Sequence, residues 1–271
     1  MGEPSMTEVP LPGGDVTEGV VRVDDTVRRP LGPHSPLVHA VLNHLENVRF
    51  SGAPRFFGID GKGRETLTFV DGEVAVRPWP GWVADEARII SVAKLVRAFD
   101  DAMEPFGVPD DLIGHTQRPE PDGCPPRIPL PQNLIGHQDV TPENVVFRSG
   151  QAHALIDFDM LRPAAREEEV VNVLLWWAPL MPPDDRESAL SEVDAMRRVR
   201  LIVDAYGLAE RDRLPELIIR MNERAWFLMR WRAQTQGGGW QRMWDEGVGD
   251  VIERRTTWLR ERTDELGEAL G

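Results

Sequence analysis

The sequence predicts an α+β protein with two lobes, a small β-rich N-lobe over residues 1–75 and a larger helical C-lobe over residues 76–271. Two observations support this fold class. Short alternating runs and tight turns fill the first part of the chain, whereas long stretches with apolar residues at helical spacing fill most of the rest. Prolines and glycines gather between residues 72 and 81, where we expect the lobes to join.

The composition is that of an ordinary soluble globular protein. Hydrophobic residues make up 41% of the chain and the net charge is −14, so attraction to a phosphate backbone is missing and no nucleic-acid partner is expected. A single cysteine, Cys124, excludes an intrachain disulfide framework. No apolar stretch is long enough to span a bilayer, and the first residues lack an apolar signal region. We therefore expect no membrane partner and a cytoplasmic location, while the oligomeric state stays open.

The N-lobe is predicted to contain a sheet and one helix. Alternating runs at 20–23 and 26–30 indicate two strands. Residues 35–47 have apolar positions at helical spacing, with Ser35 suited to the N-cap and a proline at the first helical position. Two further strands flank a glycine-rich turn at 60–63, which indicates a hairpin.

The C-lobe is predicted to be mainly helical, around a short strand-rich segment. The pattern over 84–104 is helical, and six prolines make 118–131 an irregular loop. The strand-rich segment covers 134–160. Long helical patterns then follow over 186–206, 212–236 and 245–269.

The strand-rich segment contains the candidate site. Apolar runs at 145–147 and 152–156 flank a turn and predict a hairpin. Folding this hairpin about its centre brings Asn144 opposite Asp157, and Asp139 lies in the loop that leads into it. Carboxylate and amide oxygens are ligands that Mg²⁺ prefers. A carboxylate that stays free of the metal can accept a proton from an attacking hydroxyl.

At these residues the sequence resembles the aminoglycoside phosphotransferase family, which shares the protein-kinase-like fold. The matching residues are His137-Gln138-Asp139-Val140-Thr141-Pro142-Glu143-Asn144 and Ile156-Asp157-Phe158-Asp159. The resemblance implies that Asp139 is the catalytic base, that Asn144 and Asp157 hold Mg²⁺, and that His137 supports the catalytic loop. The family often has Gly where Gln138 stands, so this loop is less permissive here.

The resemblance extends from about residue 11 to about residue 207 and assigns further roles. It implies that Gly13 and Gly14 form a turn over the nucleotide. It also implies that Phe69 and Val70 belong to a hinge whose backbone holds an adenine edge. Glu169 falls where the family usually has an Asp on a helix that braces the catalytic loop; the alternative is a solvated first turn of that helix. Asp159 is either a second metal ligand or a turn or cap residue.

One departure concerns the phosphate contact. The family normally places a Lys on the third small-lobe strand, paired with a Glu on the following helix. Here the strand carries Arg28 and Arg29, and the helix offers Val38 or His39 where the acid is expected. Arginine binds phosphate as a planar fork. Alternation directs one of the two arginines into the cleft; Arg28 is the candidate carried forward, with Arg29 as the alternative if Val27 packs into the covered face of the sheet.

The resemblance therefore predicts transfer of the γ-phosphoryl group of ATP or GTP to a hydroxyl of a small molecule. The net charge of −14 agrees with a cationic, aminoglycoside-like acceptor. Asp184, Asp185 and Glu187 are either a helix cap or contacts for such an acceptor. The alternatives are a nucleotide-binding pseudoenzyme and a kinase for another alcohol, such as a choline-type amine or a macrolide. A protein kinase is disfavoured because only eight residues separate Phe158 from Glu167, too few for a regulated activation loop.

Overall fold

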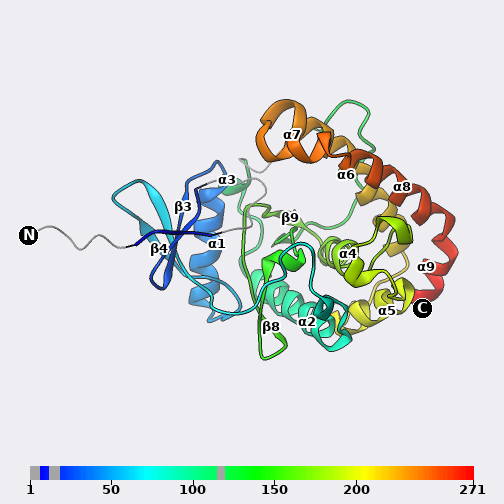
Figure 1. Ribbon diagram of the computed structural model, residues 1–271, viewed down its shortest axis with the longest axis horizontal. Helices are drawn as coiled ribbons and strands as arrows, with labels where there is room; N and C mark the ends of the chain where they lie inside the picture. Colours follow the sequence, from blue (N-terminus) through cyan, green and yellow to red (C-terminus); the bar gives the residue numbers. More distant parts are fainter. Residues whose placement is uncertain (1–6, 12–18, 115–119) are drawn as a thin grey trace, which may run out of the picture.

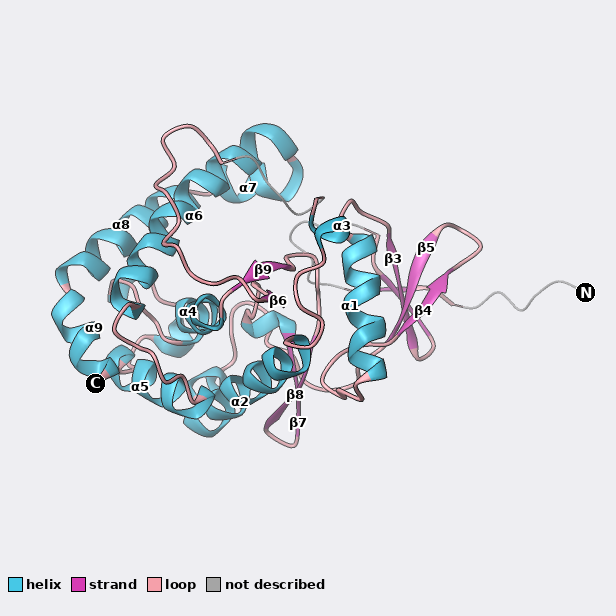
Figure 2. Ribbon diagram, turned by 180° about the vertical axis from the view of Figure 1, so that it is seen from behind, coloured by secondary structure: helices cyan, strands magenta, loops and turns pink. Residues whose placement is uncertain are grey.

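A five-stranded antiparallel sheet and one helix occupy one end of the protein, and most of the remaining helices lie at the other end (Figure 1). The computed structural model describes residues 7–11, 19–114 and 120–271. The helices α5, α6, α8 and α9 are on the far side of the molecule from the sheet in both views (Figure 2). This arrangement confirms the α+β class with a β-rich part and a larger helical part. The division at residues 75 and 76 stays a prediction.

The sheet has the strand order β1-β2-β3-β5-β4. Its strands are β1 (Val9–Pro10), β2 (Val21–Val23), β3 (Thr26–Pro30), β4 (Phe56–Ile59) and β5 (Arg64–Thr68). The register of β3 against β5 places Arg29 directly opposite Glu65. Directly opposed residues project from the same face of a sheet, so this register makes the two side chains neighbours.

The helix α1 (Ser35–Asn47) packs by its apolar face, as the spacing predicted. Its buried apolar residues are Leu37, Val38, Val41, Leu42 and Leu45. The N-cap lies one residue earlier than expected, at His34. Ser35 is the first helical residue, and its Oγ accepts a hydrogen bond from the Gly32 N–H at 2.9 Å.

The next elements place a hairpin beside the longest early helix. The helix α2 (Glu86–Met103) begins after Asp85, whose side chain accepts from the Ala87 N–H at 2.7 Å. The short strands that follow are β6 (Leu134–Gly136), β7 (Val145–Arg148), β8 (Gln151–Leu155) and β9 (Arg162–Ala164). β7 pairs with β8 in the predicted hairpin, whose two-residue turn has φ of 49° at Ser149 and 75° at Gly150. Positive φ at both positions is typical of a type I′ turn, which fits the twist of a hairpin.

The remaining helices differ from the sequence prediction in two places. They are α3 (Asp110–Ile113), α4 (Arg166–Trp177), α5 (Ala195–Tyr206), α6 (Leu214–Gln236), α7 (Gly238–Asp245), α8 (Val248–Glu261) and α9 (Thr263–Leu270). The helix expected over 186–206 begins only at Ala195, because Asp194 caps it by accepting from the Arg197 N–H at 3.0 Å. The helix expected over 245–269 is two helices that are separated at Arg262. The proline-rich loop is irregular over its described residues, 120–131.

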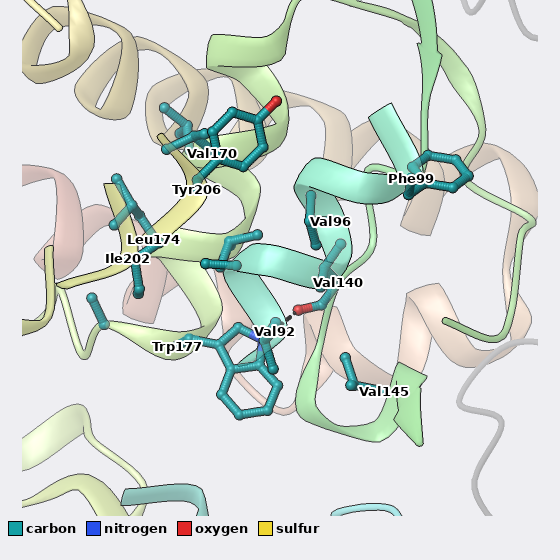
Figure 3. Close-up of a cluster of buried hydrophobic side chains, with 14 of the residues drawn as sticks. Val92, Val96, Phe99, Val140, Val145, Val170, Leu174, Trp177, Ile202 and Tyr206 are labelled. Atoms are coloured by element: carbon teal, nitrogen blue, oxygen red, sulfur yellow. Dashed lines mark hydrogen bonds between the residues drawn. The ribbon is translucent and has the colours of Figure 1, made fainter. Parts of the chain in front are cut away.

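The core joins the helices to the loop between β6 and β7. Figure 3 shows side chains of α2, α4 and α5 packed against Val140 and Val145. The indole Nε1–H of Trp177 donates to the Val140 carbonyl at 2.8 Å (Figure 3), so α4 holds the loop by a buried hydrogen bond. Within 7–11, 19–114 and 120–271, none of the helices combines the length and the apolar character that crossing a membrane requires.

Candidate active site

The open end of the β7–β8 hairpin carries the residues singled out from the sequence. The side-chain Nδ2 of Asn144 donates to the backbone carbonyl of Asp139 and to its Oδ2, both at 2.9 Å. Across the hairpin, the Ile156 N–H donates to the Asn144 carbonyl at 2.9 Å, and Asp157 follows directly. The structure thus brings Asp139 and Asn144 into contact and places Asp157 next to the residue that pairs with Asn144. As a whole residue, Asp139 is half-buried.

His137 is a fully buried link between the loop and the hairpin. Its Nε2 is 3.1 Å from the Ile156 carbonyl, and its ring lies edge-on to Phe158 with centroids 4.8 Å apart. Burial lowers the pKa of His137 to about 4, so the imidazole is neutral at pH 7. This placement suits a residue that holds the loop and not one that transfers protons.

Glu169 on α4 braces the backbone of the same loop. It is fully buried, and its carboxylate accepts from the backbone N–H of His137 at 3.1 Å and of Gln138 at 3.2 Å, and from the Gln138 side-chain amide. Burial raises the pKa of Glu169, while these donors oppose the rise. The bracing position expected for Glu169 is therefore the one the structure gives it, and the solvated-turn alternative is wrong.

Asn172 on α4 is a second brace of this loop, and it was not among the predicted residues. The Oδ1 of Asn172 accepts from the Val140 N–H at 2.8 Å, and its Nδ2 donates to the Gln138 carbonyl at 3.0 Å. Asn172 lies three residues after Glu169, so both side chains project from one helix face. That spacing was the signal available in the sequence.

Two residues of the site adopt a left-handed backbone that side chains other than glycine rarely occupy. φ is 59° at Gln138 and 60° at Asp157. Gln138 is held there by Glu169, by Asn172 and by Arg162, whose guanidinium bonds the Gln138 side-chain oxygen. Such strain persists where the surroundings over-determine the conformation, as they do in this loop.

The cation at the site is Arg29, which corrects the choice of Arg28. The Nη1 of Arg29 is 3.3 Å from Asp157 Oδ1, and its Nη2 bonds Asp159. Its Nε is 2.7 Å from the carboxylate of Glu65. Arg28 instead donates to Thr26 Oγ1 at 2.5 Å and contacts Asp60, so it points away, as expected if Val27 faces the core.

Neighbouring carboxylates shift one another's pKa at this site. Burial, followed by the charges of Asp157 and Glu143, raises the pKa of Asp139 to about 7. Burial and the neighbouring Asp159 raise the pKa of Asp157, against the effect of Arg29. Burial also opposes ionisation of Asp159, but a hydrogen bond from His34 and the charge of Arg29 lower its pKa to about 2. Within the described residues, Asp157 and Asp159 both contact the guanidinium of Arg29.

This donor set fits a divalent cation. The Asp157 side chain is 41% exposed. The Asn144 side chain directs its Nδ2 donor toward Asp139, so its Oδ1 points away from Asp139. A bound cation would offset the charge of Asp159, which after burial raises the pKa of Asp157. Among the described residues no three His, Cys, Asp or Glu side chains form a metal cluster. Asn144 and Asp157 could supply two oxygen ligands, and Mg²⁺ characteristically completes its shell with water and phosphates.

Of the four backbone residues expected to contact the nucleotide, two are not described and two line a separate cavity. Gly13 and Gly14 lie outside the described residues. Phe69 and Val70 line a cavity of about 520 Å³ whose lining includes none of Asp139, Asn144, Asp157 or Arg29. The Phe69 N–H donates to the Asp25 carbonyl at 2.8 Å, so it is not available to an adenine edge.

Two of the three acids considered for a cationic acceptor pair with arginines. Asp185 is 2.5 Å from Arg254, and Glu187 is 2.7 Å from Arg77. Asp184 and Asp185 lie in a short 3₁₀ turn, Pro183–Asp185, and do not cap a long helix. Glu187 is the N-cap residue of a second short 3₁₀ helix, Ser188–Leu190, without a side-chain cap hydrogen bond.

The chain is similar to a known protein family, to a named bacterial protein and to solved structures. A sequence model described as the phosphotransferase enzyme family matches residues 92–202. The trifolitoxin immunity protein of Rhizobium leguminosarum bv. trifolii is 34% identical over 210 residues, which are 76% of each chain.

Two solved structures have the same fold at low sequence identity. The ethanolamine kinase of Plasmodium vivax superposes with a TM-score of 0.62 at 10% identity, over 94% of this chain and 82% of that one. The GDP complex of aminoglycoside 2′-phosphotransferase-IIIa superposes with a TM-score of 0.55 at 14% identity, over 96% of this chain and 93% of that one.

Proposed function

Because the chain belongs to the phosphotransferase enzyme family, we propose that it transfers the γ-phosphoryl group of ATP or GTP to a hydroxyl of a small molecule. The observation that carries this proposal is the contact of Asp139 with Asn144 at the hairpin end, beside Asp157 and Arg29. We also propose that residues 1–75 cover the nucleotide and that residues 76–271 hold the acceptor.

The proposed step is an in-line displacement at the γ-phosphorus. The acceptor oxygen forms a bond to phosphorus, the bond to the β-phosphate oxygen breaks, and a nucleoside diphosphate leaves. Asp139 accepts the hydroxyl proton, and a pKa of about 7 makes its carboxylate an efficient base near neutral pH. Asn144 keeps that carboxylate in place through its Nδ2 hydrogen bond.

The remaining groups of the site bind and orient the nucleotide. Asn144 and Asp157 would hold Mg²⁺, which offsets phosphate charge in the transition state. Arg29 offers its two Nη groups to a phosphate, at the side where they now contact Asp157 and Asp159. Glu169 and Asn172 fix the backbone that carries Asp139.

The acceptor class rests on weaker support than the reaction. The structural neighbours are named for ethanolamine and aminoglycoside acceptors, both cationic alcohols. The acidic surface agrees with such acceptors, but Asp185 and Glu187 are already paired with arginines. The relative with 34% identity is named for immunity to a toxin. We therefore propose protective phosphorylation of a small antibiotic or toxin, with an amino-alcohol kinase as the second candidate.

Phosphoryl transfer can be measured with γ-labelled ATP and GTP over a panel of aminoglycosides, amino alcohols, macrolides and trifolitoxin. We expect transfer to at least one alcohol, lost by about 10³-fold or more in Asp139→Asn, because the base is then absent. Asp101→Asn serves as the control, since it makes the same substitution at an exposed aspartate of α2 that pairs with Arg97. Full turnover by Asp139→Asn would exclude Asp139 as the base.

The rival function is a nucleotide-binding or scaffold pseudoenzyme. It predicts no transfer to any alcohol while the protein remains folded. A panel without any labelled product, in a protein that unfolds cooperatively, would favour that rival over the enzyme. Growth of a sensitive host in the presence of each toxin separates protection from the other acceptor classes.

A further inference from the structure

Glu65 occupies an unusual position for a carboxylate in a small sheet. It lies in the middle of the sheet on β5, and its side chain is 1% exposed. Buried carboxylates are rare unless both oxygens are satisfied. Here one oxygen is 2.7 Å from Arg29 Nε and the other is 2.6 Å from His39 Nε2. Glu65 therefore links β3, through Arg29, to α1, through His39.

The partner on α1 is itself held firmly. The His39 ring stacks on Phe56 of β4 with centroids 3.8 Å apart and an interplanar angle of 11°. Stacking fixes the plane of the imidazole and hence the direction of its Nε2. Strand β3 and helix α1 thus meet at the two oxygens of Glu65, and β4 fixes the imidazole of His39 through Phe56.

This arrangement determines which face of Arg29 stays available. Glu65 takes the Nε side of the guanidinium, so the two Nη groups point to Asp157 and Asp159. Of the three carboxylates, Asp157 has the longest contact, 3.3 Å, and the most exposed side chain, 41%. An incoming phosphate can therefore replace Asp157 at Arg29 while Glu65 stays in place.

We propose that Glu65 is the positioning residue of the phosphate-binding arginine. The acid expected on α1 is absent, and a strand carboxylate anchored by His39 replaces it. Glu65 holds the long Arg29 side chain in one rotamer, so that two donors face the phosphates before a nucleotide arrives. This inference rests on the proposed function, because it requires Arg29 to contact a nucleotide.

Binding of ATP or GTP in the presence of Mg²⁺ tests the proposal directly, by calorimetric titration of the full chain. In Glu65→Gln the amide can still contact both partners, its oxygen facing Arg29 and its NH2 donating to an unprotonated His39 Nε2, but the charge is lost. We expect the nucleotide Kd to rise about tenfold, since a charge-assisted bond is roughly twice as strong as a neutral one. Turnover at saturating nucleotide should change by less than about threefold, because the reacting groups are intact.

Moving the negative charge from position 65 to position 39 distinguishes a positioning role of Glu65 from a packing role. In the double variant Glu65→Gln with His39→Glu, a carboxylate returns to the same network from the α1 side, and most of the lost affinity should return. Glu46→Gln is the matched control, because Glu46 also lies on α1 but pairs with the exposed Arg55. It should leave the Kd unchanged.

Three outcomes contradict different claims. If wild type binds neither nucleotide, both the proposed function and this inference fail. If wild type binds and Glu65→Gln binds equally well, the inference alone fails. If Glu65→Gln binds weakly and the double variant gains nothing while both unfold at the wild-type temperature, Glu65 is a packing residue and the positioning role is wrong.

Discussion

Asp139 illustrates how single residues of this site are kept in unfavourable states. Burial and the neighbouring carboxylates raise its pKa to about 7, although an unfolded Asp has a pKa near 3.9. Gln138 before it adopts a φ of 59° that only the surrounding hydrogen bonds maintain. Sites that are arranged for chemistry commonly lose stability in this way.

The first prediction concerns the stability of Asp139→Asn in metal-free buffer. Folding raises this pKa, so the folded chain binds the proton more tightly than the unfolded chain. The free energy of unfolding therefore loses this contribution as pH rises from about 4 to about 7. The variant lacks the titrating group, and its stability relative to wild type should grow by about 2–3 kcal/mol between about pH 5 and about pH 8. Denaturant titrations at the two pH values measure it; a difference independent of pH would contradict the raised pKa.

At the scale of elements, α4 and β6 together set the position of the loop that carries Asp139. Glu169 and Asn172 on α4 satisfy backbone groups of residues 137, 138 and 140. Gly136, the last residue of β6, leaves room for this brace, because a Cβ there would lie 2.2 Å from Glu169 Oε1 and 2.9 Å from the Ala164 Cβ. The chain therefore needs glycine here for a close approach and not for its backbone angle.

The second prediction concerns Gly136→Ala. The added methyl group displaces the Glu169 carboxylate and leaves buried N–H groups of the loop unsatisfied, so the free energy of unfolding should fall by about 1–3 kcal/mol. Turnover should fall with it, because Asp139 loses its fixed position. Gly61→Ala is the control, since a Cβ at Gly61 meets no atom within 4 Å. Equal effects of the two substitutions would show that the brace contributes nothing.

Across the whole molecule, one buried arginine connects distant segments of the helical part. The guanidinium of Arg198 on α5 donates to the carbonyls of Trp177 at 2.7 Å, Val83 at 3.2 Å and Ala84 at 2.5 Å. Its side chain is almost completely buried, and burial lowers its pKa to about 10. These bonds tie the end of α4 to the turn before α2.

The third prediction follows from those three carbonyls. Arg198→Leu leaves them buried and unpaired, so the free energy of unfolding should fall by about 2–4 kcal/mol. Arg200→Leu is the control on the same helix, because Arg200 also donates to two carbonyls but is exposed, and it should cost less than about 1 kcal/mol. Denaturant midpoints of both variants measure the difference. A loss as small as that of Arg200→Leu would contradict the structural role of Arg198.

Local patterns in the sequence predicted much of this molecule, because they depend on near neighbours. The apolar spacing of α1, the β7–β8 hairpin and the loop from Asp139 to Asn144 are all set within a few residues. The choice between Arg28 and Arg29 is not set within a few residues, because it depends on which face of β3 packs on the core. The partnership of Arg29 with Glu65 depends on strand register 36 residues apart, which periodicity does not encode.

The predicted start of one long helix failed for a related reason. Residues 186–194 have helical apolar spacing, but the chain there forms short turns held by Arg186, which donates to the carbonyls of Met181 and Val193. Tertiary hydrogen bonds of this kind override local propensity. Asn172 was missed although it lies three residues after Glu169, because that spacing alone does not show which loop the two side chains contact.

The central claim is that the hairpin end holds a metal–nucleotide complex beside a separate base. A thermal-unfolding titration with ATP, with and without Mg²⁺, compares wild type, Asp157→Ala and Asp139→Asn in one experiment. We expect a Mg²⁺-dependent rise in the unfolding temperature for wild type and Asp139→Asn, and none for Asp157→Ala. An equal rise in Asp157→Ala, or no rise in wild type at millimolar ATP or GTP, would contradict it.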